Sequence, residues 1–215
     1  MVQSQYSTPE ERQRLLARGR RLEYFTLAWN GAEGLVGIVA GLAAGSISLV
    51  GFGVDSFIEV ASGGTLLWRM SVDGDACHRE RRDVVALRIV GLCFLGLSGY
   101  VAYAAIHDLW TGAAPEHSAA GIVLACAALV VMPLLSRAKR RVGAALRSSA
   151  MQADARQADF CAYLSAILLA GLLLNLVWGW WWADPIAALI MAPIIANEGI
   201  AGLRSRACCD EPGYL

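Results

Sequence analysis

The chain has 215 residues, of which 57% are hydrophobic, and its formal net charge is zero. The apolar share exceeds the roughly 45–50% of an ordinary soluble domain, so the composition favours a membrane protein. We expect no nucleic-acid partner, because the chain lacks a basic stripe interleaved with aromatic residues. Its six cysteines show no regular spacing, which argues against a disulfide framework.

Six apolar segments come close to the ~20 residues that a membrane-spanning helix needs. In chain order these segments are 24–43, 47–70, 84–106, 119–136, 154–177 and 185–203. The connections at 44–46, 108–117 and 178–185 are short, so the helices are expected to form three antiparallel hairpins. The predicted fold class is all-α, a six-helix transmembrane bundle in the lipid bilayer.

The third of these connections, WGWWWADP, predicts where the sixth helix begins. Asp184 is a natural N-cap, and Pro185 fits the first helical position. Trp178 and the three tryptophans at 180–182 predict an aromatic belt at the membrane interface.

The distribution of basic residues predicts the orientation. All eighteen lysines and arginines lie in the N-terminal tail, near the 70–88 connection, in the 137–147 connection, at position 156, or after the sixth helix. By the positive-inside rule, both termini face the cytoplasm. We therefore expect a multi-pass protein of a bacterial inner (plasma) membrane, with its basic loops inside.

The predicted domain organisation has three parts. Residues 1–23 form a basic, amphipathic cytoplasmic tail, residues 24–205 form the six-helix transmembrane domain, and residues 206–215 form a short cytoplasmic C-terminal tail. The last segment is too short for a folded soluble domain, so we expect the function to lie in or beside the membrane.

Two acids interrupt the second apolar segment, SISLVGFGVDSFIEVASGG. Asp55 and Glu59 are four residues apart and lie on one face of a helix. Each carboxylate costs about 2.5–3.5 kcal/mol near the bilayer centre, so the pair needs a physical reason. A divalent metal ion between the two acids is the simplest one. A watery vestibule or an interhelical hydrogen-bond network is the alternative.

The fifth segment begins QADARQADFCAYLS and places four polar side chains on one helical face, namely Asp154, Gln157, Cys161 and Ser165. Arg156 and Asp159 point elsewhere, and their spacing favours an ion pair near the cytoplasmic surface. Taken alone, Gln157 and Cys161 are typical of ordinary packing and hydrogen bonding between helices.

Three stretches carry a resemblance to the cation diffusion facilitators, and this resemblance spans essentially the whole six-helix chain. SLVGFGVDSFIEVASG is similar to the second transmembrane helix of that family, ADARQADFCAYLS to the start of the fifth, and WADPIAALIMAPIIANEG to the sixth. The resemblance implies a divalent metal bound at mid-membrane by two residues of each of helices two and five, and exchanged against protons by alternating access. Those residues fall on Asp55, Glu59, Gln157 and Cys161.

The second pair departs from the family pattern, which usually has a His or Asp and then an Asp. Asp154, on the same face, is a further candidate ligand. Glu33 on the first helix is interpreted either as part of a proton path or of the site, or as a contact with a neighbouring helix beside Asn30. The soluble C-terminal domain usual in the family is not expected here.

The resemblance and the residues together predict an exporter of a divalent metal from the cytoplasm, driven by proton exchange. Zinc is the first choice, as transported substrate and not as a tightly bound cofactor. We expect a homodimer, because Gly96 and Gly99 share a face of the third helix and permit close approach. The alternative is a non-transporting membrane regulator or subunit with a degenerate metal site. No enzymatic constellation is evident, so an enzyme is not expected.

Overall fold

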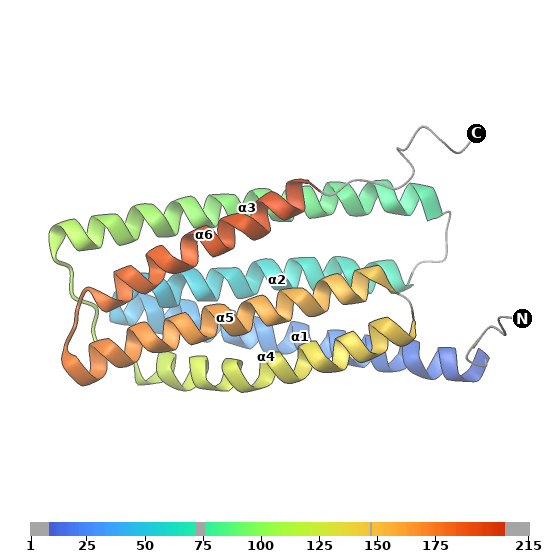
Figure 1. Ribbon diagram of the computed structural model, residues 1–215, viewed down its shortest axis with the longest axis horizontal. Coiled ribbons are helices and arrows are strands. Elements are labelled where there is room, and N and C mark those ends of the chain that lie inside the picture. The colour runs from blue at the N-terminus through green and yellow to red at the C-terminus, as the bar shows by residue number, and fades with distance from the viewer. Residues whose placement is uncertain (1–8, 72–75, 147, 205–215) are drawn as a thin grey trace, which may run out of the picture.

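The computed structural model describes residues 9–71, 76–146 and 148–204, and these form six α-helices that run lengthwise beside one another (Figure 1). The helices are α1 (Pro9–Ala44), α2 (Ile47–Ser71), α3 (Ala76–Thr111), α4 (Ala119–Ala145), α5 (Ser149–Trp178) and α6 (Ala183–Leu203). Each of the six contains a stretch that is long and apolar enough to cross a membrane. The predicted all-α, six-helix fold is thereby confirmed.

Large apolar side chains cover the outside of the bundle. Leu42, Tyr103 and Val123, from three different helices, are each 69–70% exposed. Such an exterior would be costly in water but is favourable against lipid chains. The interior holds a second apolar set, which includes Phe52, Val101, Met132, Leu168 and Met191.

Three helices extend beyond the apolar segments that predicted them. α1 begins at Pro9 and runs without a break past residue 23, so the predicted tail boundary falls inside this helix. α3 begins at Ala76 instead of 84, and α4 continues to Ala145 instead of ending at 136. Arginine, lysine and glutamate are good helix formers, so a helix can continue where its apolar run ends.

The helices form three tightly packed pairs, α1 with α2, α4 with α5, and α3 with α6. Of the three predicted hairpins, the first is therefore confirmed and the second was wrong, because α3 packs against α6 and not against α4. α5 does contact α6, but it packs more closely against α4. Figure 1 shows α3 and α6 along one edge of the molecule, while α1, α2, α4 and α5 are grouped together on the other side. α2 contacts α1, α3, α5 and α6. This central helix therefore places its polar side chains inside the protein.

Short turns join the helices at one end of the bundle, at the left in Figure 1. Gly45 and Gly179 both have φ of 65°, the left-handed conformation that ends a helix tightly. Hydrogen bonds then connect the turns. Glu116 N donates to Ala44 O at 2.7 Å, and Asn175 Nδ2 donates to Pro115 O at 3.1 Å.

Asp184 does not cap α6, and that prediction was wrong. The helix begins one residue earlier, at Ala183, and its N-cap position is Trp182, which makes no side-chain capping bond. The Asp184 carboxylate instead accepts hydrogen bonds from the hydroxyls of Ser46, at 2.6 Å, and Ser48. Tertiary contact with the α1–α2 turn has replaced the local cap.

Glycines have different roles in the two halves of α3. A Cβ added at Gly91 would lie 2.6 Å from the backbone oxygen of Gly199 on α6, so this glycine permits the close α3–α6 crossing. Gly96 and Gly99 have no heavy atom within 4 Å of such a Cβ. They face outward, and their use in a dimer stays a prediction.

Candidate metal site

Close contact between α1 and α2 positions the polar residues of both helices. A Cβ added at Gly53 of α2 would lie 2.7 Å from Ile38 N and 3.0 Å from Gly34 O of α1, and one at Gly37 would lie 3.0 Å from the Cα of Gly53. Only glycine lets two backbones approach so closely. Polar side chains of α1 and α2 that lie next to these glycines consequently face each other.

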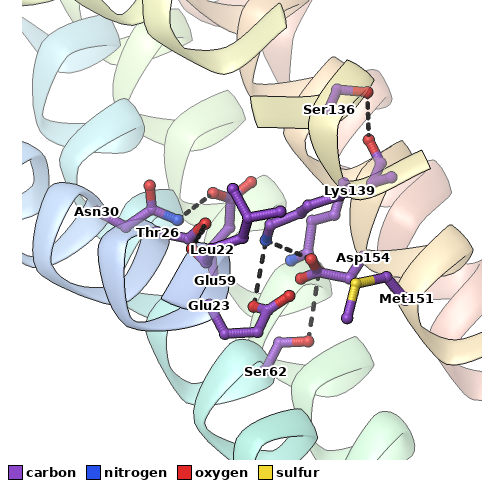
Figure 2. Close-up of polar contacts among 12 residues, drawn as sticks. Leu22, Glu23, Thr26, Asn30, Glu59, Ser62, Ser136, Lys139, Met151 and Asp154 are labelled. Atoms are coloured by element: carbon purple, nitrogen blue, oxygen red, sulfur yellow. Dashed lines mark hydrogen bonds and ion pairs between the residues drawn. The ribbon is translucent and has the colours of Figure 1, made fainter. Parts of the chain in front are cut away.

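The two acids of α2 are buried beside this contact. Asp55 is 3% exposed and Glu59 is 7% exposed. Asn30 of α1 donates a hydrogen bond from Nδ2 to Glu59 Oε2 at 2.7 Å, and Figure 2 shows these two side chains meeting. Among the described residues, neither acid forms an ion pair with a lysine, arginine or histidine.

Glu33 of α1 is the third acid of this region. It is 1% exposed, and neither of its carboxylate oxygens has a hydrogen-bond partner among the described residues. Its carboxylate interacts electrostatically with Asp55, and Glu59 interacts with both of them. We call Glu33, Asp55 and Glu59 the acidic cluster.

Helix α5 brings its two predicted ligands to the same region in different ways. Gln157 Oε1 accepts a hydrogen bond from Ser62 of α2 at 3.3 Å. Cys161 is fully buried in the core, and its thiol lies within electrostatic reach of all three acids of the acidic cluster. The backbone oxygen of Cys161 accepts from Ser165 at 2.7 Å. A role for either side chain in metal binding stays a prediction.

Asp154, the fifth predicted ligand, belongs to an ion-paired cluster whose Asp154 and Lys139 lie within electrostatic reach of Glu59 (Figure 2). The fully buried Nζ of Lys139 on α4 contacts Asp154 Oδ2 on α5 and, at 3.2 Å, Glu23 Oε2 on α1. This ion-paired cluster of Glu23, Lys139 and Asp154 joins three helices. Asp154 thus already has a cationic partner within the chain.

The sequence interpretation missed Lys139 because it lies within a run of basic residues assigned to a loop. The spacing of the residues that α4 buries would have pointed to Lys139, because the same spacing can be read in the sequence. The buried positions Ala128, Met132, Leu135, Lys139 and Val142 are three or four residues apart, so they continue a single helical face. Basic residues next to Lys139 point outward.

Asp159 was expected to pair with Arg156, and that expectation was wrong. Asp159 pairs instead with Arg140 of α4, a contact between two partly exposed side chains. Arg156 lies within electrostatic reach of Glu198 on α6. Packing of α4 against α5 brings the distant arginine closer than the local one.

The structure does not gather the predicted ligands into a finished coordination shell. Within residues 9–71, 76–146 and 148–204, no group of three or more His, Cys, Asp or Glu side chains is arranged to hold a metal ion. The acidic cluster nevertheless concentrates three carboxylates that form no ion pair with a described residue, although Lys139 lies within electrostatic reach of Glu59. Ionisable groups in such positions are typical of ion pathways.

A bundle of six helices that are long and apolar enough to span a membrane, with buried acids at its centre, is typical of proteins that carry ions across membranes. Comparison with known families agrees, since the cation efflux transmembrane domain matches residues 25–206. The chain belongs to this family, the cation diffusion facilitators. It is therefore a multi-pass integral membrane protein of a transporter family and not an enzyme.

The chain is similar to several curated proteins. It is 28% identical to Transmembrane protein 163 of Xenopus laevis over 156 residues, which cover 72% of this chain and 55% of that protein. It is 25% identical to an uncharacterized transporter of Synechocystis over 174 residues, 77% of this chain and 56% of the relative. The chain thus spans about half the length of these relatives.

A third relative carries a more specific name. The cation-efflux pump FieF of Shewanella oneidensis is 32% identical over 91 residues, which cover 42% of this chain and 30% of the pump. The similarity supports cation efflux as the activity of the family. It leaves the transported ion to be argued from the residues themselves.

Proposed function

We propose that the protein exports a divalent metal ion from the cytoplasm in exchange for protons, with zinc as the first candidate. The observation that carries this proposal is the burial of Asp55 and Glu59 one turn apart without a cationic partner in the described chain. Buried charges are normally paired or bind a metal. A transported cation supplies the missing positive charge.

The chemistry of the site explains how metal and protons would be exchanged. Carboxylates bind a metal only when they are deprotonated, so protons and a metal ion compete for the oxygens of Asp55 and Glu59. On α5, the Cys161 thiol adds a soft ligand that favours zinc over magnesium or calcium, and Gln157 adds an amide. Net transport also requires that the two sides of the membrane reach the site alternately.

The hydrogen bonds at the short-turn end suggest what must change during that alternation. Ser46 and Ser48 hold Asp184, and Asn175 holds the α3–α4 connection, so this end of the bundle is tied together. We propose that this end faces outward and that these bonds break when the site opens to the outside. The basic end then faces the cytoplasm, in keeping with the positive-inside rule.

A second candidate is a membrane regulator or subunit that retains the fold without transporting metal. The observation that favours it is the pair on α5, where an amide and a thiol stand in place of the usual His or Asp and Asp. Gln157 is also already bonded to Ser62. Transport measurements separate the two candidates.

The test uses the purified full chain in sealed vesicles that carry a pH gradient and a zinc-sensitive dye. We expect zinc to accumulate in wild-type vesicles, to do so faster with the gradient than without it, and to move protons in the opposite direction. Vesicles with the double variant Asp55→Asn, Glu59→Gln provide the matched control. Zinc flux in wild-type vesicles equal to that in protein-free vesicles would favour the regulator.

Orientation and assembly belong to the same proposal. Single cysteines introduced near Gly112 should react with an impermeant thiol reagent from outside, and those near Arg140 only from inside. The protein is also proposed to be a homodimer that uses the outward face around Gly96 and Gly99. Cross-linking in native membranes should detect that dimer.

A further inference from the structure

Three buried oxygen atoms on the α2-facing side of α1 lack a hydrogen-bond partner among the described residues. They are both carboxylate oxygens of Glu33 and the side-chain oxygen of Asn30. Both residues are only 1% exposed. Most buried polar atoms in proteins are satisfied, so three orphaned acceptors within one helical turn require an explanation.

Nearby donors do not satisfy Glu33. The indole Nε1 of Trp29 also has no partner in the described chain, although it is close to this carboxylate. The hydroxyl of Ser56 also lies near this carboxylate, and it donates to Phe52 O at 3.1 Å. Both donors are close to Glu33, but neither has the geometry of a hydrogen bond to its oxygens in the described chain, so these oxygens are open to a cation.

Both α1 residues are directed at the acids of α2. Asn30 already contacts Glu59 through Nδ2, which leaves its Oδ1 atom free to accept. Glu33 interacts electrostatically with Asp55. The glycine contact between the helices keeps the two backbones close, so polar side chains of α1 and α2 share one buried region.

We propose that Asn30 and Glu33 of α1 bind the transported divalent cation together with Asp55 and Glu59 of α2. The described structure does not hold these acids in a finished metal-binding arrangement, so their side chains would close around the ion when it arrives. This inference rests on the proposed function, because it concerns ligands of the same transported ion. Zinc and harder divalent ions such as manganese can be coordinated by carboxylate and amide oxygens. The oxygens of α1 also make up for the acids that α5 lacks at Gln157 and Cys161.

Metal binding by the full chain in detergent micelles tests the proposal without requiring transport. Zinc and manganese are titrated into wild type, Glu33→Gln, Glu33→Asp and Asn30→Ala, with Glu10→Gln, an exposed acid of the same helix, as the matched control. Outer-shell partners of a metal already contribute about 10–100-fold in affinity, so loss of the Glu33 ligand should weaken binding at least about tenfold. Glu33→Asp should retain most of the affinity, and Asn30→Ala should lose less than Glu33→Gln.

Melting temperatures separate ligand loss from unfolding. Glu33→Gln removes a buried, unpartnered charge, so its metal-free melting temperature should equal or exceed that of wild type, while the increase caused by metal shrinks. Unchanged affinity in Glu33→Gln, or a collapse of its metal-free fold, would overturn the role of α1. If Asp55→Asn loses binding at the same time, the proposed function survives. Absence of zinc and manganese binding to wild type would overturn both.

Discussion

The ion-paired cluster and the acidic cluster solve the same electrostatic problem differently. Glu23 and Glu33 are ten residues apart on α1, which corresponds to about 15 Å along the helix. At the first position, two carboxylates share the ammonium group of Lys139. At the second, three buried carboxylates have no ion-pair partner among the described residues. One cluster has its cation built into the chain, and the other is proposed to receive one.

This contrast separates structural from transport roles. A buried ion pair that joins α1, α4 and α5 fixes how those helices pack, and losing one partner leaves a buried charge uncompensated. An acid without a built-in partner destabilises the resting protein but gains a large interaction when a cation arrives. We therefore propose that Asp154 belongs to the framework and that Asp55 and Glu59 bind the transported ion.

The largest effect is expected from neutralising the acidic cluster. Asp55→Asn should abolish metal transport, because it removes a ligand charge, and should leave membrane insertion and folding intact, because it removes a buried charge as well. Vesicle uptake and the melting temperature measure the two effects separately. Full export by the double variant Asp55→Asn, Glu59→Gln would show that the two clusters do not differ in the proposed way.

Neutralising the cation of the ion-paired cluster should have the opposite pattern. Lys139→Met leaves Glu23 and Asp154 buried without their partner, and we expect a loss of about 3–5 kcal/mol in the free energy of unfolding. Unfolding in mixed micelles measures it. The matched control is the triple variant Glu23→Gln, Lys139→Met, Asp154→Asn, which should regain most of the stability. A single variant as stable as wild type would contradict the structural role.

The sequence predicted the acidic cluster better than the ion-paired cluster. Charges inside a long apolar run are visible without a structure, and Asp55 and Glu59 were found in that way. Lys139 lies where the apolar run has already ended, and its partners come from helices that are distant in the sequence. Asp159 and Asp184 show the same limit, because each found a tertiary partner in preference to the local one that its spacing indicated.

The number of helices, in contrast, follows from local information. About 20 apolar residues are needed to cross a bilayer, and every predicted segment of that kind became a helix. The helix ends did not follow, since α3 and α4 continue into their charged flanks. The sequence also did not predict where helices cross closely. Gly91 permits a close crossing only because Gly199 of another helix lies opposite it.

A smaller, metal-dependent effect is expected at the border of the acidic cluster. If Cys161 is a ligand, Cys161→Ser should reduce zinc transport about tenfold. This is the lower end of the ~10–100-fold loss that substitutions around a metal site typically cause. Cys161→Asp should retain function and shift the preference toward manganese, because oxygen is a harder ligand than sulfur. Parallel zinc and manganese uptake measures this, with Cys126→Ser as a control for an exposed thiol. Unchanged rates for both metals in both variants would make Cys161 a packing residue.

The smallest effect is expected at Arg140, one residue beyond Lys139. Its ion pair is exposed, whereas that of Lys139 is buried, so the two positions show how burial changes the strength of an ion pair. Arg140 also pairs with an aspartate of α5, but its side chain is 55% exposed and that of Asp159 is 32% exposed. Water and salt already stabilise both groups, so Arg140→Met should change the free energy of unfolding by no more than about 1 kcal/mol. The same micelle unfolding experiment places this variant beside Lys139→Met. Equal losses in the two variants would mean that burial does not decide the strength of these neighbouring ion pairs.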